Sequence, residues 1–159
     1  MKSSQSKTSI TNPDHLRLGK LGEAYAAAYL DQLGYRLVAA NFTIPVGRTL
    51  RGAIINSEID LIAYDGPTLC FIEVKTRTSD WFAPPQVNVD RRKQRQIARA
   101  AHAYRRMLQL EGEPHRYDVV TVLLGDGSSQ SQSPQVDLLK NYWREDQFKK
   151  SHRYLGFYD

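Results

Sequence analysis

Four charged side chains interrupt the apolar pattern of two neighbouring strand-like segments near the middle of the chain. Glu58 and Asp60 fall in the first segment, and Glu73 and Lys75 fall in the second. A four-residue loop at 65–68, which leaves its proline unpaired, places Asp60 opposite Glu73. The same register places Glu58 opposite Lys75. A two-residue loop moves the pairs along the strands but keeps both charged sets on one face, because strand side chains alternate between faces.

Two opposed carboxylates, about 5 Å apart at Cβ, repel each other unless a positive charge neutralises them. A hard cation such as Mg²⁺ (or Mn²⁺) binds one or two carboxylates and keeps its other positions for water and phosphate. We therefore expect Asp60 and Glu73, with a neighbouring carbonyl such as that of Val74, to bind this metal. The metal can activate a water and polarise a phosphodiester. Lys75 can hold that water or the scissile phosphate as a compact charge.

The alternative for these charges is an exposed hairpin face that carries a solvated lattice of cross-strand ion pairs. A Glu-x-Lys pattern alone is compatible with that alternative. Two features favour the metal site. The segment is the central apolar part of the chain, where charges are costly to bury, and Asp60 precedes Glu73 at a matching strand position.

A predicted helix precedes these strands. Apolar residues at helical spacing predict it over 16–33, with Gly34 ending it. Gly22 lies on the apolar face of this helix, which suggests that the helix approaches a sheet closely. Glu23 lies on the flank of that face, so it is not confined to the outer polar side.

Strand-like patterns and turn residues divide most of the remaining chain. Residues 43–56 are expected to form a loop or an irregular hairpin, and 78–88 a connecting loop. Strands are predicted at 35–42, 58–64, 69–76 and 117–124, with a candidate edge strand at 136–139.

A second helix is predicted over 90–110, with Asp90 as its N-cap and residues 111–112 closing it. This helix is long enough to carry the chain to a parallel strand, whereas the three strands before it suit an antiparallel meander. The order α-β-β-β-α-β therefore predicts an α/β fold, with a mixed central sheet flanked by helices.

The composition fits one domain with an anionic partner. The chain has 159 residues, a net charge of +5 and a pI of about 9.4, which favours nucleic acid over an acidic small substrate. We expect a disordered lead-in at 1–14, a domain at 15–140 and an aromatic, basic tail at 141–159. No apolar run reaches the length of about 18 residues that a membrane helix needs. The polar start and the single cysteine, Cys70, which we expect to be buried and inert, predict a cytoplasmic protein.

Three motifs occur in order along the predicted elements. They are Gly19-x-x-Gly22-Glu23-x-x-Ala26, Glu58-Ile59-Asp60-Leu61-Ile62-Ala63 and Phe71-Ile72-Glu73-Val74-Lys75-Thr76-Arg77. In this combination the chain resembles the YraN-type bacterial proteins. These look like members of the PD-(D/E)xK nuclease superfamily, similar in core to archaeal Holliday-junction resolvases. The resemblance covers residues 16–124 and implies a restriction-endonuclease-like core.

The resemblance also implies roles for individual residues. Asp60 and Glu73 match the metal-binding acids, and Lys75 matches the lysine of the third strand. Glu23 matches the glutamate of the first helix, a further carboxylate near the metal. These four would be the catalytic residues. The alternative for Glu23 is a surface glutamate that interacts with the helix dipole, and Glu58 would be a partner of Lys75.

The chain departs from the family pattern at two places. Ser57 occupies the position before the Glu-Ile-Asp run, where the family usually has glycine. The segment 43–56 is longer than expected and carries its own basic residues. These departures leave the substrate-facing loop unpredicted, but they do not affect the core.

The start of the second predicted helix is strongly basic. A helix N-terminus favours phosphate, so we expect this run to bind nucleic acid. The alternative is a solvated helix face. Lys93 shares a line with Ile97 and should point further inward than its neighbours. The candidate nucleic-acid-binding residues are Arg91, Arg92, Lys93, Arg95 and Arg99.

Histidines and aromatic residues receive no catalytic role. The histidines lack metal-ligand spacing, and most of the aromatic side chains are expected to pack against other residues rather than stack on unpaired bases. The histidines are His15, His102, His115 and His152, and the aromatic residues are Trp81, Phe82, Tyr142, Trp143 and Tyr154.

The sequence therefore predicts a metal-dependent endonuclease that hydrolyses DNA phosphodiesters, with branched or structured DNA among its candidate substrates. A homodimer is implied by analogy with resolvase-like enzymes alone. One alternative is a non-catalytic nucleic-acid-binding module on a nuclease scaffold. Another is an interaction protein whose basic helix docks an acidic partner.

Overall fold

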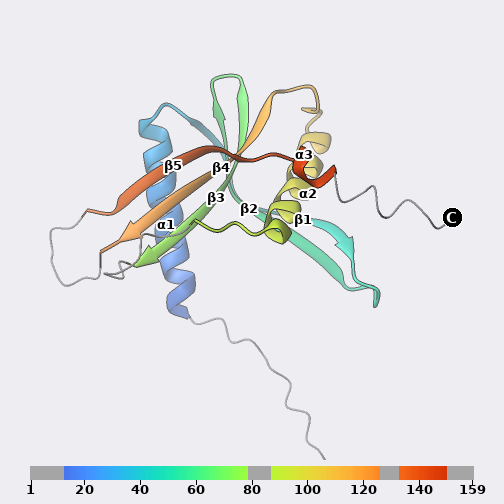
Figure 1. The fold of residues 1–159 in the computed structure, drawn as a ribbon, viewed down its shortest axis with the longest axis horizontal. Helices are drawn as coiled ribbons and strands as arrows, with labels where there is room; N and C mark the ends of the chain where they lie inside the picture. The colour runs from blue at the N-terminus through green and yellow to red at the C-terminus, as the bar shows by residue number, and fades with distance from the viewer. Residues whose placement is uncertain (1–12, 79–86, 126–132, 150–159) are drawn as a thin grey trace, which may run out of the picture.

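The structure is a computed structural model that describes residues 13–78, 87–125 and 133–149 (Figure 1). Its elements follow the order α-β-β-β-α-β-β-α, and the five strands form one sheet in the order β1-β2-β3-β4-β5. The elements are α1 (Pro13–Gln32), β1 (Arg36–Arg48), β2 (Ile54–Asp65), β3 (Thr68–Thr78), α2 (Arg91–Met107), β4 (His115–Leu124), β5 (Gln135–Trp143) and α3 (Asp146–Lys149).

The sheet is mixed, as predicted. Strands β1, β2 and β3 form an antiparallel meander, and β4 lies parallel to β3 after the crossover through α2. Strand β5 then pairs antiparallel with β4 at the edge. This α/β arrangement is consistent with a restriction-endonuclease-like core.

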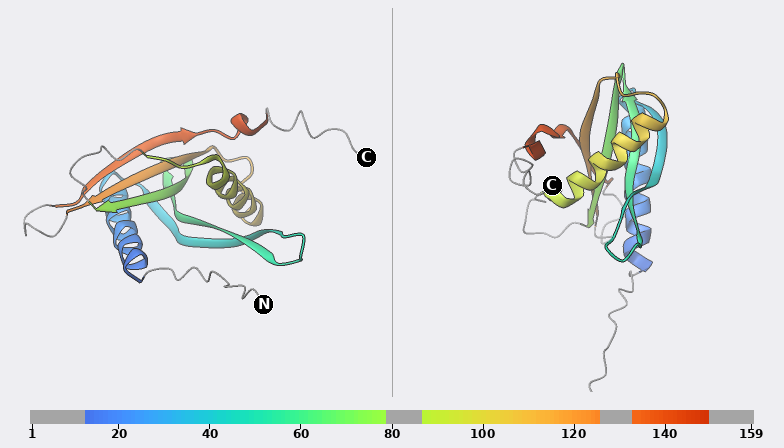
Figure 2. Two further views of the ribbon diagram at one scale, coloured as in Figure 1. Left: turned by 60° about the horizontal axis from the view of Figure 1, so that its bottom comes forward. Right: turned by 90° about the vertical axis from the view of Figure 1, so that its right-hand side faces the viewer.

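The helices cover opposite faces of the sheet (Figure 2). On one face, Ala26 and Leu30 of α1 pack in a cluster that includes Ile72 and Val120. On the other face, Ile97, Ala100, Ala101 and Tyr104 of α2 belong to a separate cluster with Phe71 and Val119. Both faces of the central part of β3 are therefore buried, so the charge of Glu73 is shielded from water.

Gly22 brings α1 against β3. A Cβ atom at this position would lie 1.7 Å from Thr76 Oγ1 and 2.7 Å from Thr76 Cβ. No real Cβ makes such a contact, so only glycine allows this approach. The predicted close approach of the helix to the sheet is confirmed.

A network of charges ties the strands together near the β2–β3 turn. Asp118 is fully buried, and both of its oxygens accept hydrogen bonds of 3.0 Å from Arg116 Nε. The same guanidinium donates to Asp65 Oδ2 at 2.7 Å and to Tyr35 at 2.7 Å. Asn141 N donates to Asp118 at 2.8 Å, which adds β5 to the network. Strands β2, β4 and β5 are therefore linked at this end of the sheet.

Several predicted boundaries were wrong. Of the two alternatives for 43–56, the irregular hairpin is confirmed and the loop is wrong, because β1 runs on to Arg48 and β2 starts at Ile54. Strand β1 lies at the sheet edge, where a proline is tolerated. A register irregularity between Pro45 and Gly47 accommodates it.

The second helix and the last strand also differ from the prediction. Helix α2 ends at Met107, because Gln109 adopts a φ of 56°, a left-handed conformation that stops a helix. The predicted N-cap is correct, since Lys93 N donates to Asp90 Oδ1 at 2.8 Å. Strand β5 extends to Trp143, which is buried and stacks on Tyr117 at 5.0 Å.

Parts of three predicted segments lie outside the described residues. These are the first twelve residues of the lead-in, residues 79–86 of the connecting loop and residues 150–159 of the tail. Trp81, Phe82, His152 and Tyr154 belong to them. Among the residues that are described, no helix has both the length and the apolar character to cross a membrane.

Candidate active site

The site lies where β2 and β3 separate. Their ladder runs from the turn, where Asp65 pairs with Thr68, as far as Leu61 and Ile72. Beyond that point the Val74 N–H donates to Asp60 Oδ2 at 2.8 Å, so a side chain satisfies a backbone group that has left the ladder.

The predicted register is correct, but the predicted direct pairs are not formed. Tyr64 lies opposite Leu69 as expected. Asp65 also pairs with Thr68, so the turn between the strands is two residues long. The strands separate before Asp60 could pair with Glu73 or Glu58 with Lys75. The separation opens the sheet instead of leaving the carboxylates on a flat surface.

A cavity of about 510 Å³ occupies this opening. It is lined by Glu23 from α1, Asp60 from β2, and Glu73 and Lys75 from β3. The structure thus brings together all four residues that the sequence predicted to be catalytic. The flank position of Glu23 on its helix allows it to reach the opening.

Glu73 is the most buried of the four, with only 5% of its surface exposed. Two ammonium groups approach it: Lys75 Nζ lies 3.5 Å from Oε1, and Lys93 Nζ lies 3.7 Å from Oε2. Lys93 comes from the first turn of α2, so its predicted inward direction is confirmed. The buried Oε2 atom has no hydrogen-bond partner among the described residues.

Two of the carboxyl groups hold their protons more tightly than usual. Burial, followed by the negative charge of Asp60, raises the pKa of Glu73 to about 7, although Lys93 and Lys75 oppose the shift. Burial and the charge of Asp60 also raise the pKa of Glu23. The charged form of Glu73 is therefore costly in the protein alone, despite the two lysines beside it.

These residues fit a divalent cation held by two carboxylates. The unpartnered Oε2 of Glu73 and the adjacent Asp60 are hard oxygen donors, and Mg²⁺ sites of one or two carboxylates are completed by water and phosphate. Across the described part of the chain, no three His, Cys, Asp or Glu side chains lie close enough to hold a metal without such help. Asp60 and Glu73 are therefore the two protein ligands to test.

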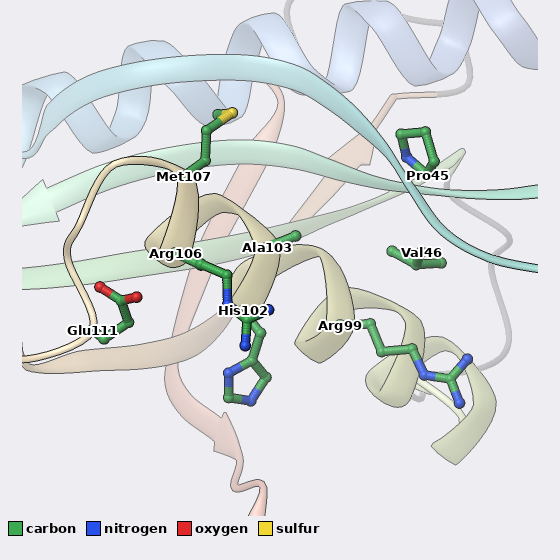
Figure 3. A pocket seen from close by; sticks show the side chains of 8 residues that line it. All are labelled: Pro45, Val46, Arg99, His102, Ala103, Arg106, Met107 and Glu111. Carbon is green, nitrogen blue, oxygen red and sulfur yellow. The ribbon is translucent and has the colours of Figure 1, made fainter.

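The four candidate arginines of α2 are all exposed, at positions 91, 92, 95 and 99. The Arg95 guanidinium also lies 6.0 Å from the ring of Phe148. Arg99 lines a second hollow, of about 640 Å³, between α2 and β1. Figure 3 shows Pro45 and Val46 of β1 beside this part of the helix.

Two placements of histidines were not predicted from the sequence: one in the cavity and one beside Glu145. His15 lines the cavity with Glu23, and the spacing of residues 15, 19 and 23 at i, i+4 and i+8 could have indicated a common helix face. His102 Nε2 and His115 Nε2 lie 2.8 and 3.5 Å from the carboxylate of Glu145. No sequence spacing predicts this second cluster, because α2, β4 and the segment after β5 each contribute a residue.

Cys70 is fully buried, as expected. Burial raises the pKa of its thiol to about 12, so the thiolate is strongly disfavoured.

Sequence comparison identifies relatives of the chain. The family described as "Uncharacterised protein family UPF0102" matches residues 22–122. A UPF0102 protein of Syntrophus aciditrophicus (strain SB) is 42% identical over 110 residues, which are 69% of this chain and 79% of the relative. A UPF0102 protein of Koribacter versatilis (strain Ellin345) is 38% identical over 129 residues, 81% of this chain and 80% of the relative.

Structural comparison adds little. A solved structure titled "Crystal structure of SSO0001" has a TM-score of 0.36 and 11% identity, over 92% of this chain and 62% of that one, which is too weak to support an argument. The family match is stronger evidence. It extends from Gly22, where α1 packs against β3, to β4, and it includes Glu23, Asp60 and Glu73. The chain belongs to the UPF0102 family, the YraN-type group with a nuclease-like fold.

Proposed function

We propose that this protein is a metal-dependent endonuclease that hydrolyses DNA phosphodiesters. The observation that carries the proposal is the convergence of Asp60, Glu73 and Lys75 in one cavity where β2 and β3 separate. A buried glutamate whose Oε2 accepts no hydrogen bond, and which has only the more distant Lys93 ammonium at 3.7 Å, is costly for a fold to keep. Such a group is better explained by a bound cation than by packing.

Asp60 and Glu73 would hold Mg²⁺ or Mn²⁺, with the open positions left for water and a phosphate oxygen. When bound, the cation would supply Lewis-acid polarisation of the phosphodiester and of the attacking water. The proton that Glu73 retains near neutral pH must leave before this carboxylate can serve as a ligand.

The chain's own groups then orient the reactants. Lys75 is about one-third exposed, so its ammonium can reach a water or a non-bridging phosphate oxygen in the cavity while it stays near Glu73. Lys93 approaches Glu73 from α2 and can hold the adjoining phosphate. Glu23 faces the charge of Asp60 from α1, and its raised pKa suits it to proton transfer at the leaving or attacking oxygen.

The substrate is assigned from charge. The net charge of +5 and the exposed Arg91 and Arg92 next to Lys93 favour a polyanion over a small acid. DNA that is branched or otherwise structured, and a homodimer that cleaves it, are proposed by analogy with the resolvase-like members of the superfamily.

The test uses purified protein, Mg²⁺ or Mn²⁺, and end-labelled duplex, single-stranded and four-way DNA. Asp60→Asn, Glu73→Gln and Lys75→Gln should each reduce cleavage at least about 100-fold, while DNA affinity changes much less. Asp31→Asn, which removes an exposed carboxylate from the same helix as Glu23, is the matched control and should cleave normally. Binding without cleavage by the wild type would instead favour the non-catalytic binding module. Equal cleavage by all variants would show that this site is not catalytic.

A further inference from the structure

We propose that the β1–β2 hairpin is a DNA-binding arm that contacts the duplex backbone about six base pairs from the cleaved phosphate. The inference rests on the proposed function, because it requires a DNA duplex in the cavity between β2 and β3. It assigns a role to the part of the chain, residues 43–56, that departs most from the family pattern.

The hairpin projects beyond the body of the molecule (Figures 1 and 2). Its tip carries Leu50, whose side chain is fully exposed at 109% of the reference area, and Ile54, which is 54% exposed. Neither residue belongs to the two core clusters. Phe42, Ile44 and Val46 pack against the core, so packing accounts for the base of the hairpin but not for its tip.

The tip is nevertheless well defined. Thr49 N donates to Ala53 O at 2.8 Å, and Gly52 N donates to Thr49 O at 2.9 Å. The Thr49 hydroxyl accepts from Ala53 N at 3.1 Å, and Arg48 donates to Gly52 O at 3.0 Å. Gly52 adopts a φ of 81°, which completes the turn. A tip fixed in this way presents its side chains without a large loss of entropy on binding.

The charge of the hairpin suits a polyanion. Residues 36–57 contain three arginines and no Asp or Glu. Arg51 extends from the tip next to Leu50, and no ion pair holds it within the described chain. The base of the hairpin is also basic on the side of α2, because Arg99 and Arg106 line the hollow beside Pro45 and Val46.

The position of the tip follows from strand geometry. Asp60 and Ile54 lie on the same strand, six residues apart, which corresponds to about 20 Å of extended chain. Duplex DNA rises about 3.4 Å per base pair, so about six base pairs span the distance to Ile54. Arg51 and Leu50 lie in the turn just beyond it. A duplex with its scissile phosphate at Asp60 and Glu73 can thus place a flanking phosphate at Arg51, with Leu50 against the adjoining sugar or groove floor.

The first experiment measures DNA affinity without a divalent metal, by fluorescence anisotropy over a range of salt. Arg51→Gln should weaken binding several-fold and lower the salt slope by about 0.9, the value for one phosphate contact. Arg36→Gln is the matched control, because it removes the same charge from the far end of β1. Equal affinities and salt slopes for the wild type and Arg51→Gln would show that the hairpin is not a DNA-binding arm.

The second experiment maps the tip on DNA. Cys70 is the only cysteine and is fully buried, so Leu50→Cys creates a single reactive thiol for an iron-EDTA conjugate. Radical cleavage should centre about six base pairs to one side of the metal-dependent cut. Radical cleavage that is absent, or spread evenly, would also overturn the arm.

The two proposals fail separately. The arm is wrong and the endonuclease stands if the wild type cleaves DNA but Arg51→Gln binds DNA like the wild type and the Leu50→Cys conjugate gives no localised cleavage. If the wild type binds DNA with the predicted Arg51 dependence but never cleaves it, the arm stands and the endonuclease is wrong. If the wild type does not bind DNA, both are wrong.

Discussion

Glu73 shows how the site is built at the scale of one residue. Its carboxylate is almost completely buried on a strand whose neighbouring side chains are apolar, and Asp60 lies beside it. The two lysines at 3.5 and 3.7 Å only partly offset this cost. The residue is therefore expected to weaken the fold of the metal-free protein, as groups with a functional role often do.

Glu73→Gln should stabilise the metal-free protein at pH 8. The folded-state pKa of Glu73 is raised to about 7, so its favourable contribution is complete below about pH 4.5 and is lost as the pH rises through 7. Because the glutamine side chain is neutral at every pH, we expect Glu73→Gln to raise the free energy of unfolding by about 1–3 kcal/mol at pH 8. Urea titrations at pH 8 and pH 5 test this, because the gain should be much smaller at pH 5. A loss of stability at pH 8 would contradict the expectation.

Mn²⁺ binding should compete with a proton at the same residue. Because Glu73 must lose its proton to bind the metal, the affinity should fall by up to about tenfold per pH unit below pH 7. Calorimetric titrations in two buffers of different ionisation enthalpy measure the proton that is released. Binding that does not depend on pH between 5.5 and 7.5 would show that Glu73 is not a ligand.

The sequence was most informative at this scale. Asp60, Glu73, Lys75 and Glu23 were all predicted, because their strand and helix positions constrain where their side chains can point. The contact of Lys93 with Glu73 could also be anticipated, because Lys93 lies on the inward side of its helix. The Glu145 cluster could not, since its partners come from segments that only the tertiary fold brings together.

At the scale of elements, the position of α1 depends on a single close approach. Gly22 lets the helix backbone lie against Thr76, and the next residue, Glu23, points into the cavity. The contact therefore sets both the packing of α1 and the distance from Glu23 to Asp60.

Gly22→Ala should destabilise the protein by about 1–3 kcal/mol, because the added methyl group cannot coexist with Thr76 and the helix must move. Gly19→Ala is the matched control one turn earlier. A Cβ there meets nothing within 4 Å, and alanine favours the helix by up to about 1 kcal/mol. Thermal unfolding of both variants is the measurement. Equal effects of the two substitutions would mean that α1 does not lie as close to β3 as described.

The segment after β5 is held by Glu145. Burial acts to raise its pKa, but hydrogen bonds from His115, Tyr117 and His102 outweigh this and lower it to about 2. A carboxyl group with a lowered pKa contributes stability above pH 4.5, and that stability is lost as the pH falls through 2.

Glu145→Gln should therefore destabilise the protein by about 1–2 kcal/mol near pH 6. The difference from wild type should shrink as the pH falls below 4.5, because the unfolded wild-type chain then binds a proton at Glu145 that the folded chain does not. Urea unfolding at pH 6, 4.5 and 3 measures the difference. Asp146→Asn, at the next residue in an exposed position, is the control and should have little effect. A destabilisation that does not change over this range would argue against the ionic cluster.

The elements were predicted better at their centres than at their ends. The three central strands, the two long helices and the parallel crossover were all anticipated. The length of the hairpin strands was missed because Pro45, Gly47 and Gly52 are typical of loops, yet β1 is an edge strand that tolerates them. The length of β5 was missed because its last residue, Trp143, is stabilised by stacking on Tyr117, a contact between distant parts of the chain.

At the scale of the whole molecule, the sheet has one end tied and one end open. The Arg116–Asp118–Asp65 network holds the strands together near the β2–β3 turn. At the other end, β2 and β3 separate, and a helix reaches the opening from each face of the sheet. The resulting site can hold a cation between the strands, with basic side chains around the entrance.

Anomalous diffraction from crystals grown or soaked with millimolar Mn²⁺ can show whether Asp60 and Glu73 bind a metal together. We expect one strong manganese peak within coordination distance, about 2.0–2.3 Å, of both carboxylates, with Lys75 beside it. The same crystals of Asp60→Asn should lack the peak. Well-ordered wild-type crystals without manganese between these two carboxylates, or with manganese bound only elsewhere, would contradict the account.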